Sequence, residues 1–285
     1  MHKRNARFLV ELFNHRDGST LRWYQVILRN IVAGIDAGST AVKLVIFDGQ
    51  QMGFWQQPTG WSPAEVTHQM LDQALREWTI SRGDLRHICG TGYGRVNLPF
   101  LNTTVTEIAC HSRGAAYLRP GVELVIDIGG QDAKGIQVGP KGRVLDFVMN
   151  DKCAAGTGRF LSVMAHALGL DVSELGAYAG GEEVSPQPIN AMCTVFAESE
   201  VIGLINRGVD RKAIVAGLHH SVARRVAAMI ARFDGDGPLL FTGGVSRNEA
   251  IRVALEKELK RPVEVNEHSP YAGALGAALI AWEKA

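Results

Sequence analysis

The sequence predicts an α/β protein built from two related lobes, and three observations support that fold class. The chain has 285 residues, of which 46% are hydrophobic, so it can bury a core large enough for one large domain or two lobes. Strand-like apolar runs alternate along it with helix-like amphipathic runs. A glycine-rich segment also occurs twice: IDAGSTAVK, from Ile35, and IDIGGQDAK, from Ile126, carry Asp, Gly and Lys at the same internal positions.

Each glycine-rich segment is expected to form the turn of a β-hairpin. The first lies between strand-like runs at 31–35 and 42–47, and the second lies between similar runs at 124–126 and 135–138. Glycine between two β-branched runs is typical of a hairpin turn. A motif that recurs at this distance indicates two related lobes rather than a short-period solenoid.

The helices are predicted from capping residues and from apolar spacing. Ser62, Pro63 and Glu65 form the start signal of a helix that runs toward Trp78. A third glycine segment, LLFTGGVSRN, follows the pattern of an apolar strand that leads into a helix. One long helix is predicted from an apolar stripe with helical spacing, made of Ile214, Leu218, Val222, Val226 and Ile230.

These elements divide the chain into a predicted extension and two lobes. We expect the first lobe to span residues 30–120 and the second to span residues 121–285, with the chain returning to the first lobe near its C-terminus. Residues 1–29 fit neither lobe and are interpreted as an appended or partly disordered segment without an assigned role.

The overall composition argues against nucleic-acid and membrane partners. The net charge is +1, and acidic and basic residues are interspersed, so no basic patch for nucleic acid or anionic lipid is indicated. The apolar stretch at 272–282 is shorter than the ~20 residues of a membrane helix. The first residues carry scattered charges and no cleavage pattern of an export signal. We therefore predict a cytoplasmic protein whose four cysteines are not paired as disulfides.

The glycine turns are predicted to bind phosphate groups, because backbone N–H groups approach an anion most closely where side chains are small. Lys43 adds a positive charge, while Asp36 and Asp127, at strand ends, can hold Mg²⁺ through its waters. Gly243 and Gly244 suit a close approach to the nucleoside. The alternative is that these are three ordinary strand exits. The residues of the two phosphate turns are Gly38, Ser39 and Thr40 in the first and Gly129, Gly130 and Gln131 in the second.

Two cysteines stand before helix-like runs and are candidate metal ligands. Cys153 and Cys193 each precede such a run, and the positive end of a helix dipole stabilises a thiolate. The alternative is that each is a small buried hydrophobic residue. An all-cysteine [4Fe–4S] cluster needs four thiolates, whereas one chain offers two at such positions. Other residues are interpreted as core or surface groups: Cys89, Cys110, His111, His166, His219 and His220.

The order of the three glycine motifs is similar to that of a known superfamily. DAGST, DIGGQD and TGGVSRN resemble the phosphate-1, phosphate-2 and adenosine motifs of the actin-like ATPases, over the chain from Ile31 to its end. TGYGR, NDKCAAGTGRF, CTVFAESEVI and YAGALGAALIA resemble the activator components of 2-hydroxyacyl-CoA dehydratases, in the BadF/BadG/BcrA/BcrD-type ATPase family.

This resemblance implies a duplicated actin-like (ribonuclease H-like) fold and an ATPase coupled to electron transfer. It implies a homodimer that holds one [4Fe–4S] cluster, ligated by Cys153 and Cys193 from each subunit. The implied partners are a 2-hydroxyacyl-CoA dehydratase, which receives a low-potential electron, and an electron donor similar to ferredoxin or flavodoxin.

The resemblance also assigns roles around MgATP. Gln131 and Asp132 are candidates for positioning the attacking water, and Asp36 is the third catalytic candidate. The residues expected to contact the nucleotide are Gly38, Ser39, Thr40, Ala41, Val42, Lys43, Gly129, Gly130, Gln131, Gly243 and Gly244.

Three other functions share parts of this pattern. The ATPase subunit of a benzoyl-CoA-reductase-type complex shares the fold, the cluster and the cysteines. A small-molecule kinase shares the nucleotide turns but needs no cysteine pair. A nucleotide-gated chaperone needs a peptide-binding domain after the two lobes, and no such segment is seen before Ala285. Iron content separates the kinase from the dehydratase activator and from the reductase subunit.

Overall fold

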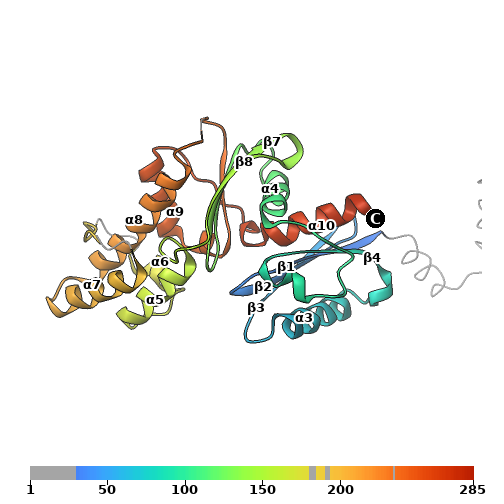
Figure 1. The fold of residues 1–285 in the computed structure, drawn as a ribbon, viewed down its shortest axis with the longest axis horizontal. Helices are drawn as coiled ribbons and strands as arrows, with labels where there is room; N and C mark the ends of the chain where they lie inside the picture. The colour runs from blue at the N-terminus through green and yellow to red at the C-terminus, as the bar shows by residue number, and fades with distance from the viewer. Residues whose placement is uncertain (1–29, 180–183, 190–192, 234) are drawn as a thin grey trace, which may run out of the picture.

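The computed structural model describes residues 30–179, 184–189, 193–233 and 235–285, which form two β-sheets with helices around them (Figure 1). This confirms the predicted α/β class. The predicted extension at 1–29 lies outside the described residues. Within the described part of the chain, no helix is long and apolar enough to cross a membrane.

The first sheet has five strands in the order β3-β2-β1-β4-β5. β1 pairs antiparallel with β2, which places Asp36 opposite Lys43, and pairs parallel with β4. The first predicted hairpin is therefore confirmed. The strands are β1 (Ile31–Ala37), β2 (Ala41–Phe47), β3 (Met52–Pro58), β4 (Leu85–Thr91) and β5 (Thr103–Thr104).

The second sheet repeats this arrangement with four strands in the order β8-β7-β6-β9. β6 pairs antiparallel with β7, which places Asp127 opposite Lys134, and pairs parallel with β9. The second predicted hairpin is confirmed, and β6, β7, β8 and β9 correspond in order and direction to β1, β2, β3 and β4. The strands are β6 (Leu124–Ile128), β7 (Ala133–Gly139), β8 (Arg143–Asn150) and β9 (Leu239–Thr242).

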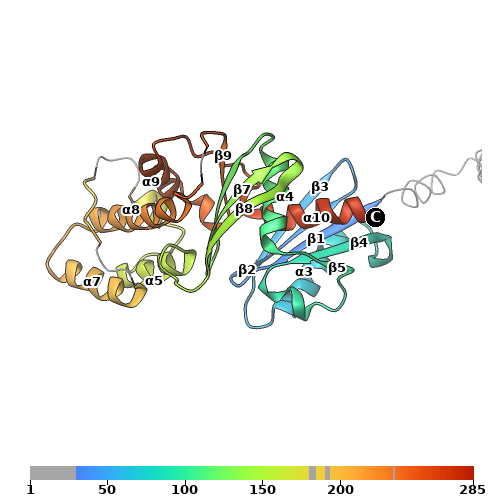
Figure 2. The same cartoon turned by 45° about the horizontal axis from the view of Figure 1, so that its top comes forward.

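Helices cover both sheets. α3 begins after Ser62, whose hydroxyl accepts a hydrogen bond from the Glu65 backbone N–H, as its capping signal predicts. On the second sheet, α5, α7, α8 and α9 lie on the side away from α4 (Figure 2), and the whole predicted apolar stripe of α8 is buried. The helices are α3 (Pro63–Glu77), α4 (Glu107–Leu118), α5 (Gly158–Leu168), α6 (Leu175–Tyr178), α7 (Thr194–Asn206), α8 (Arg211–Ile230), α9 (Glu249–Leu259) and α10 (Ala272–Lys284).

Two helices, α4 and α10, cross between the sheets and join the lobes. α10 packs on β1 of the first sheet, and α4 packs on β7 and β8 of the second. Glycines allow their backbones to touch: a Cβ at Gly114 would lie 2.0 Å from the Ala272 carbonyl oxygen, and one at Gly276 would lie 1.8 Å from the Cys110 carbonyl oxygen. Any larger residue at either position would push the helices apart.

Candidate functional site

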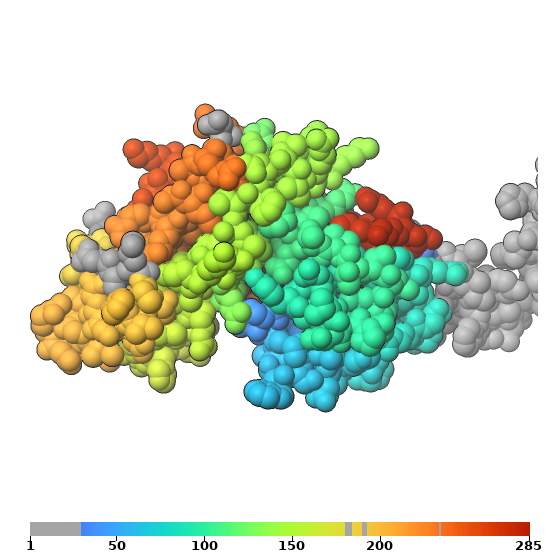
Figure 3. Space-filling model, in the orientation of Figure 1, coloured from blue at the N-terminus to red at the C-terminus, as the bar shows by residue number. Residues whose placement is uncertain are grey.

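The two glycine turns meet at the boundary between the lobes. A Cβ at Gly130, in the second turn, would lie 1.9 Å from the Thr40 hydroxyl oxygen and 3.5 Å from the Ser39 hydroxyl oxygen of the first turn. A notch opens between the lobes where the first-lobe segment, drawn in blue, comes up to the green second-lobe segments (Figure 3). The structure therefore brings the two predicted phosphate turns together. Gln131 is exposed beside them.

The second turn carries a buried cluster of charges centred on Lys134, which is 2% exposed. Its Nζ lies 2.7 Å from Asp132 Oδ2, 3.2 Å from Glu107 Oε2 and 3.3 Å from Asp127 Oδ2. Burial alone lowers the pKa of a lysine, but the three carboxylates outweigh it and raise the pKa of Lys134 above its ordinary value. Lys134 is therefore a fixed positive charge that joins α4 to the second sheet.

Asp127 is held ionised in this cluster. Burial raises the pKa of a carboxyl group, but His111 and Lys134 outweigh it and hold the pKa of Asp127 well below its ordinary range. His111 Nδ1 lies 3.1 Å from Asp127 Oδ1, and the Thr242 hydroxyl donates to the same oxygen over 3.0 Å. Lys43 also lowers the pKa of Asp127, which shows that the first-lobe lysine acts on the second-lobe carboxylate.

The pKa of Asp132 is shifted in the opposite direction to that of Asp127. Its pKa is raised by burial, and the nearby Asp127 and Glu107 carboxylates raise it further, while Lys134 offsets only part of this effect. A carboxylate with a raised pKa accepts a proton more readily near neutral pH, which is the property needed of a general base. Gln131 has no such acid–base chemistry, so the shift concerns Asp132 alone, and the roles of both residues at an attacking water stay predictions.

Equivalent glycine loops flank the two strand-end aspartates. Gly92, after β4, has φ +85° and Gly243, after β9, has φ +86°, both in the left-handed region that favours glycine. A Cβ at Gly92 would lie 2.6 Å from Asp36 Oδ1, and one at Gly243 would lie 2.9 Å from Asp127 Oδ1. The segments TGYGR and TGGVS therefore form corresponding loops in the two lobes. The sequence analysis did not detect this correspondence.

The loop after β9 borders an open space. No heavy atom lies within 4 Å of a Cβ built on Gly244, so this part of the backbone is accessible. From the same loop, Arg247 Nη2 donates to Gln56 Oε1 of β3 over 2.9 Å and so reaches the first lobe. The predicted approach of the nucleoside to Gly243 and Gly244 remains a prediction.

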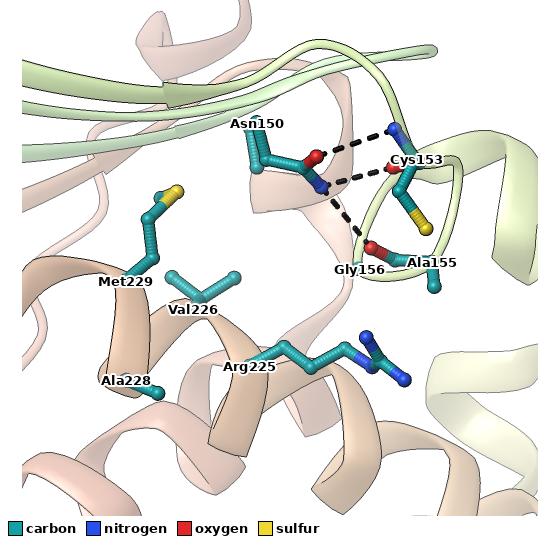
Figure 4. A pocket seen from close by; sticks show the side chains of 9 residues that line it. Asn150, Cys153, Ala155, Gly156, Arg225, Val226, Ala228 and Met229 are labelled. Carbon is teal, nitrogen blue, oxygen red and sulfur yellow. Dashed lines mark hydrogen bonds between the residues drawn. The ribbon is translucent and has the colours of Figure 1, made fainter. Parts of the chain in front are cut away.

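Cys153 lies in a loop fastened to the end of β8. The Asn150 side chain donates to the carbonyl oxygens of Cys153 (2.9 Å) and Ala155 (3.3 Å), and accepts from the Cys153 backbone N–H over 3.3 Å. A pocket of ≈ 430 Å³ adjoins this loop. In Figure 4 the Cys153 sulfur points away from Asn150, toward the side where Arg225 extends from α8.

The same loop is fastened to the second glycine turn through the start of α5. The backbone N–H of Gly158 donates to the Gly129 carbonyl over 2.9 Å, and that of Arg159 donates to the Gly130 carbonyl over 2.8 Å. Only residues 154–157 separate Cys153 from this helix. The start of α5 therefore joins the second glycine turn to the cysteine loop.

The four cysteines fall into two groups. Cys193 is exposed and is the N-cap of α7, as predicted, whereas Cys153 is half-buried and precedes α5 by a short loop instead of standing at its first residue. Cys89 and Cys110 are buried, and burial raises the pKa of both thiols, which confirms them as core residues. Among the described residues, no group of three or more His, Cys, Asp or Glu side chains is arranged to hold a metal ion.

Sequence reasoning missed two members of the charge cluster, Glu107 and His111. Both lie on α4, far along the chain from either glycine turn, and only the packing of α4 on the second sheet brings them there. The sequence analysis interpreted His111 as an ordinary core or surface residue. Its burial agrees with that interpretation, but its contact with Asp127 does not follow from any local pattern.

The fold and the facing turns define a class of protein. A ROK family glucokinase from Streptomyces griseus, solved with glucose and AMPPNP, shares the fold with a TM-score of 0.54 at 14% identity, over 89% of this chain and all of that one (100%). The duplicated arrangement is that of the actin-like ATPases and sugar kinases.

Within that class, the chain belongs to the BadF/BadG/BcrA/BcrD ATPase family, which it matches over residues 33–281. It is similar to component A of (R)-2-hydroxyglutaryl-CoA dehydratase from Acidaminococcus fermentans: 40% identity, TM-score 0.86, 90% of this chain and 98% of that chain. It is also similar to the activator of 2-hydroxyisocaproyl-CoA dehydratase from Clostridium difficile, solved with ADPNP: 39% identity, TM-score 0.84, 89% of this chain and 95% of that chain.

Proposed function

We propose that this protein is an ATP-hydrolysing iron–sulfur activator that delivers a low-potential electron to a 2-hydroxyacyl-CoA dehydratase. The observation that carries the proposal is the pair of backbone hydrogen bonds from Gly158 and Arg159 to the second phosphate turn, because they link a nucleotide turn to a cysteine loop. A plain kinase has no need of such a link. The similarity to two dehydratase activators supports the same function.

The nucleotide binds between the facing turns. Lys43 is 9% exposed, and among the described residues no ion pair involves its ammonium, so an anion such as a phosphate group can neutralise it. Asp36 offers a carboxylate near the end of β1 that fits Mg²⁺ held through its waters. Both oxygens of Asp127, at the corresponding place in β6, already contact His111, Thr242 and Lys134. Gly243 and Gly244 approach the nucleoside, since Gly244 faces open space.

Hydrolysis requires a water aligned with the γ-phosphate. Asp132 accepts a proton from that water, because its raised pKa suits a base, and Gln131 orients the water from its exposed position in the turn. Loss of the γ-phosphate removes contacts to Gly129 and Gly130. Because α5 is bonded to both carbonyls, the Cys153 loop moves with the turn.

The accessible thiols fit an iron–sulfur cluster as half of a ligand set. Cys193 is exposed at a helix N-terminus, whose dipole favours a thiolate, and Cys153 is accessible in its loop. Two thiolates are half of what an all-cysteine [4Fe–4S] cluster needs, so a homodimer completes the set. When bound, such a cluster supplies one electron at a potential as low as about −700 mV. A ferredoxin- or flavodoxin-like protein reloads it.

We keep the lobe boundaries predicted from the sequence, 30–120 and 121–285, as part of this proposal. The packing of α10 on β1 supports the return of the chain to the first lobe. The similarity to two dehydratase activators favours an activator over a permanent reductase subunit, and we expect it to be cytoplasmic.

The test is anaerobic purification of the full chain, with iron, sulfide and mass measured alongside ATP hydrolysis. We expect one [4Fe–4S] cluster per dimer. Cys153→Ser and Cys193→Ser should each abolish iron binding, whereas Cys89→Ala and Cys110→Ala should retain iron and cost only about 1 kcal/mol of stability. Iron retention in the Cys153 variant, or equal iron loss in all four, refutes the ligand set. An iron-free ATPase that phosphorylates a small molecule indicates a kinase, and copurified permanent subunits indicate a reductase-type complex.

Coupling is tested separately by the rate at which a chelator removes iron from oxidised and reduced protein, with ATP or ADP bound. A nucleotide shifts a conformational equilibrium only through different affinities for the two states. We expect the rate to change when ATP replaces ADP. Equal rates in all four conditions would mean that the cluster is a structural element, and electron gating would be withdrawn.

A further inference from the structure

Residues 243–248, which we call the nucleoside loop, end at a side chain that caps the following helix. Asn248 is the N-cap of α9, and its Oδ1 accepts a hydrogen bond from the Ile251 backbone N–H over 3.1 Å. The backbone N–H of Asn248 donates to the Val245 carbonyl over 2.9 Å, which lies inside the loop. The position of Asn248 therefore determines how the nucleoside loop stands on α9.

His219 of α8 contacts the other end of the same side-chain amide. Its Nε2 lies 3.2 Å from Asn248 Nδ2. Because Oδ1 of Asn248 already accepts from the Ile251 N–H, the amide presents its NH₂ group to the ring. Burial lowers the pKa of His219 to about 4, so the ring is neutral near pH 7 and Nε2 has a lone pair that accepts this bond.

The contact with Asn248 is what the polar ring of His219 contributes to the protein. His219 is 2% exposed, and its Nδ1 has no hydrogen-bond partner within the described ranges of the chain. Burying a ring nitrogen without a partner costs stability, which an apolar side chain of similar size would not. Packing alone therefore does not account for a histidine at this position, whereas the bond to the nucleoside loop does.

The loop that this bond fastens is open on its other side. Gly244 has no heavy atom within 4 Å of a built Cβ, and Arg247, the residue before Asn248, extends to Gln56 of the first lobe. In both ribbon views α8 lies beside α9, so the pair of helices forms the support of the loop (Figure 2). A shift of Asn248 on this support displaces the open backbone of the loop.

We propose that His219 is a positioning residue for nucleotide binding, which holds the nucleoside loop in its binding position through the hydrogen bond to Asn248. The inference rests on the proposed function, in which Gly243 and Gly244 of this loop approach the nucleoside. His219 acts only through Asn248 and is not assigned a contact with the nucleotide. Loss of the bond loosens the grip on the nucleoside, while the two phosphate turns, which belong to other segments, keep their places.

Two variants of His219 separate the bond from the packing. His219→Leu fills a similar volume without an acceptor, whereas His219→Gln places its side-chain oxygen near the position of Nε2 and keeps the acceptor. In full-length, iron-loaded protein, we expect His219→Leu to raise the Kd for ADP roughly tenfold, about the worth of one hydrogen bond, with kcat at saturating ATP within about twofold of wild type. His219→Gln should restore the Kd to within about threefold.

A variant on the loop side of the bond provides an independent test. Asn248→Ser keeps a good N-cap for α9 but is too short to reach His219, so it should raise the Kd for ADP as His219→Leu does. The double variant should be no weaker than either single one, because both remove the same bond. The matched control is Ile214→Val, a buried apolar position of α8, which should keep both kcat and Kd. Thermal unfolding of each variant establishes that it is folded.

The outcomes distinguish the role of His219 from the proposed function. A wild-type Kd in His219→Leu overturns the positioning role, and so does equal weakening in His219→Leu and His219→Gln, which is the result expected if only the packing of the ring matters. A parallel loss of kcat and ADP affinity also overturns it. A wild-type protein that binds no ADP overturns the proposed function itself.

Discussion

The two half-sites share one backbone plan but differ in what surrounds their lysines. Asp36 stands opposite Lys43 in the first sheet, as Asp127 stands opposite Lys134 in the second. Yet Lys134 is neutralised by three carboxylates, whereas no ion pair to Lys43 exists among the described residues. The duplication therefore determines where the charges stand, and their neighbours determine what the charges do.

The surroundings of Lys43 and Lys134 differ because of the residues at two corresponding positions in the lobes. The duplicated turns place Ala41 in the first lobe where the second has Asp132, and the crossing of α4 and α10 places Ser269 where the other half has Glu107. The Ser269 hydroxyl instead accepts a hydrogen bond from the Asn266 backbone N–H over 3.0 Å. Two of the three carboxylates are thus missing around Lys43, which leaves its charge for a phosphate group.

The largest expected effect is on stability, from Lys134→Ala. This change leaves the buried carboxylates of Asp127 and Asp132 and the half-buried one of Glu107 without their cation, and breaking such a buried pair costs about 3–5 kcal/mol. The measurement is the free energy of unfolding from urea denaturation. A loss below about 1 kcal/mol would show that the second half-site is not a structural one.

The matching change in the first lobe should affect catalysis instead. Lys43→Ala and Asp36→Asn should each lower ATP hydrolysis by about 10²–10³-fold, because they remove charges that act on the transferred phosphate. Iron content should stay at the wild-type level, and the loss of stability should be far smaller than for Lys134→Ala. Turnover at the wild-type rate with full metal loading contradicts the assignment of the first turn.

A substitution that makes the first half-site resemble the second should weaken nucleotide binding. Ala41→Asp introduces a carboxylate at the position equivalent to Asp132, where it competes with phosphate for Lys43 and repels the nucleotide. Like charges brought together cost several kcal/mol, so we expect the Kd for ATP to rise about 100-fold. The control is Ala41→Asn, of similar size without charge. Equal effects from both variants would mean that size, not charge, is responsible.

The smallest expected effect is on the pH dependence of stability, and it comes from His219, a histidine inside the second lobe. His219 is buried on α8, and its Nε2 lies 3.2 Å from Asn248 Nδ2; burial lowers its pKa from 6.5 to about 4. As the pH falls below 6.5, the unfolded chain gains a proton that the folded chain gains only near pH 4, so stability is lost across that window. The loss at pH 5 is about 2 kcal/mol.

Urea unfolding at pH 7 and pH 5 measures this loss. His219→Gln keeps an acceptor for Asn248 and should remove the part of the pH dependence that belongs to this group. An unchanged difference between the two pH values would show that His219 is not the residue responsible.

The local features of the fold were predictable because each depends on a short stretch of sequence. Both hairpins follow from glycine between β-branched runs, α3 follows from the cap at Ser62, and the buried face of α8 follows from its apolar spacing. Family membership was predictable from long matching segments such as NDKCAAGTGRF. The roles assigned to the turn residues and to Cys153 and Cys193 stay predictions.

By itself, the sequence determined the two Asp–Lys pairs, because an antiparallel hairpin places residues opposite each other through local register alone. Only the tertiary structure decided which lysine is neutralised. Glu107 and His111 lie between the two turns in sequence and reach the charge cluster because α4 crosses to the second sheet. Because a charge removed from water must find its partner within the protein, the presence or absence of each nearby carboxylate decides whether a buried lysine is neutralised.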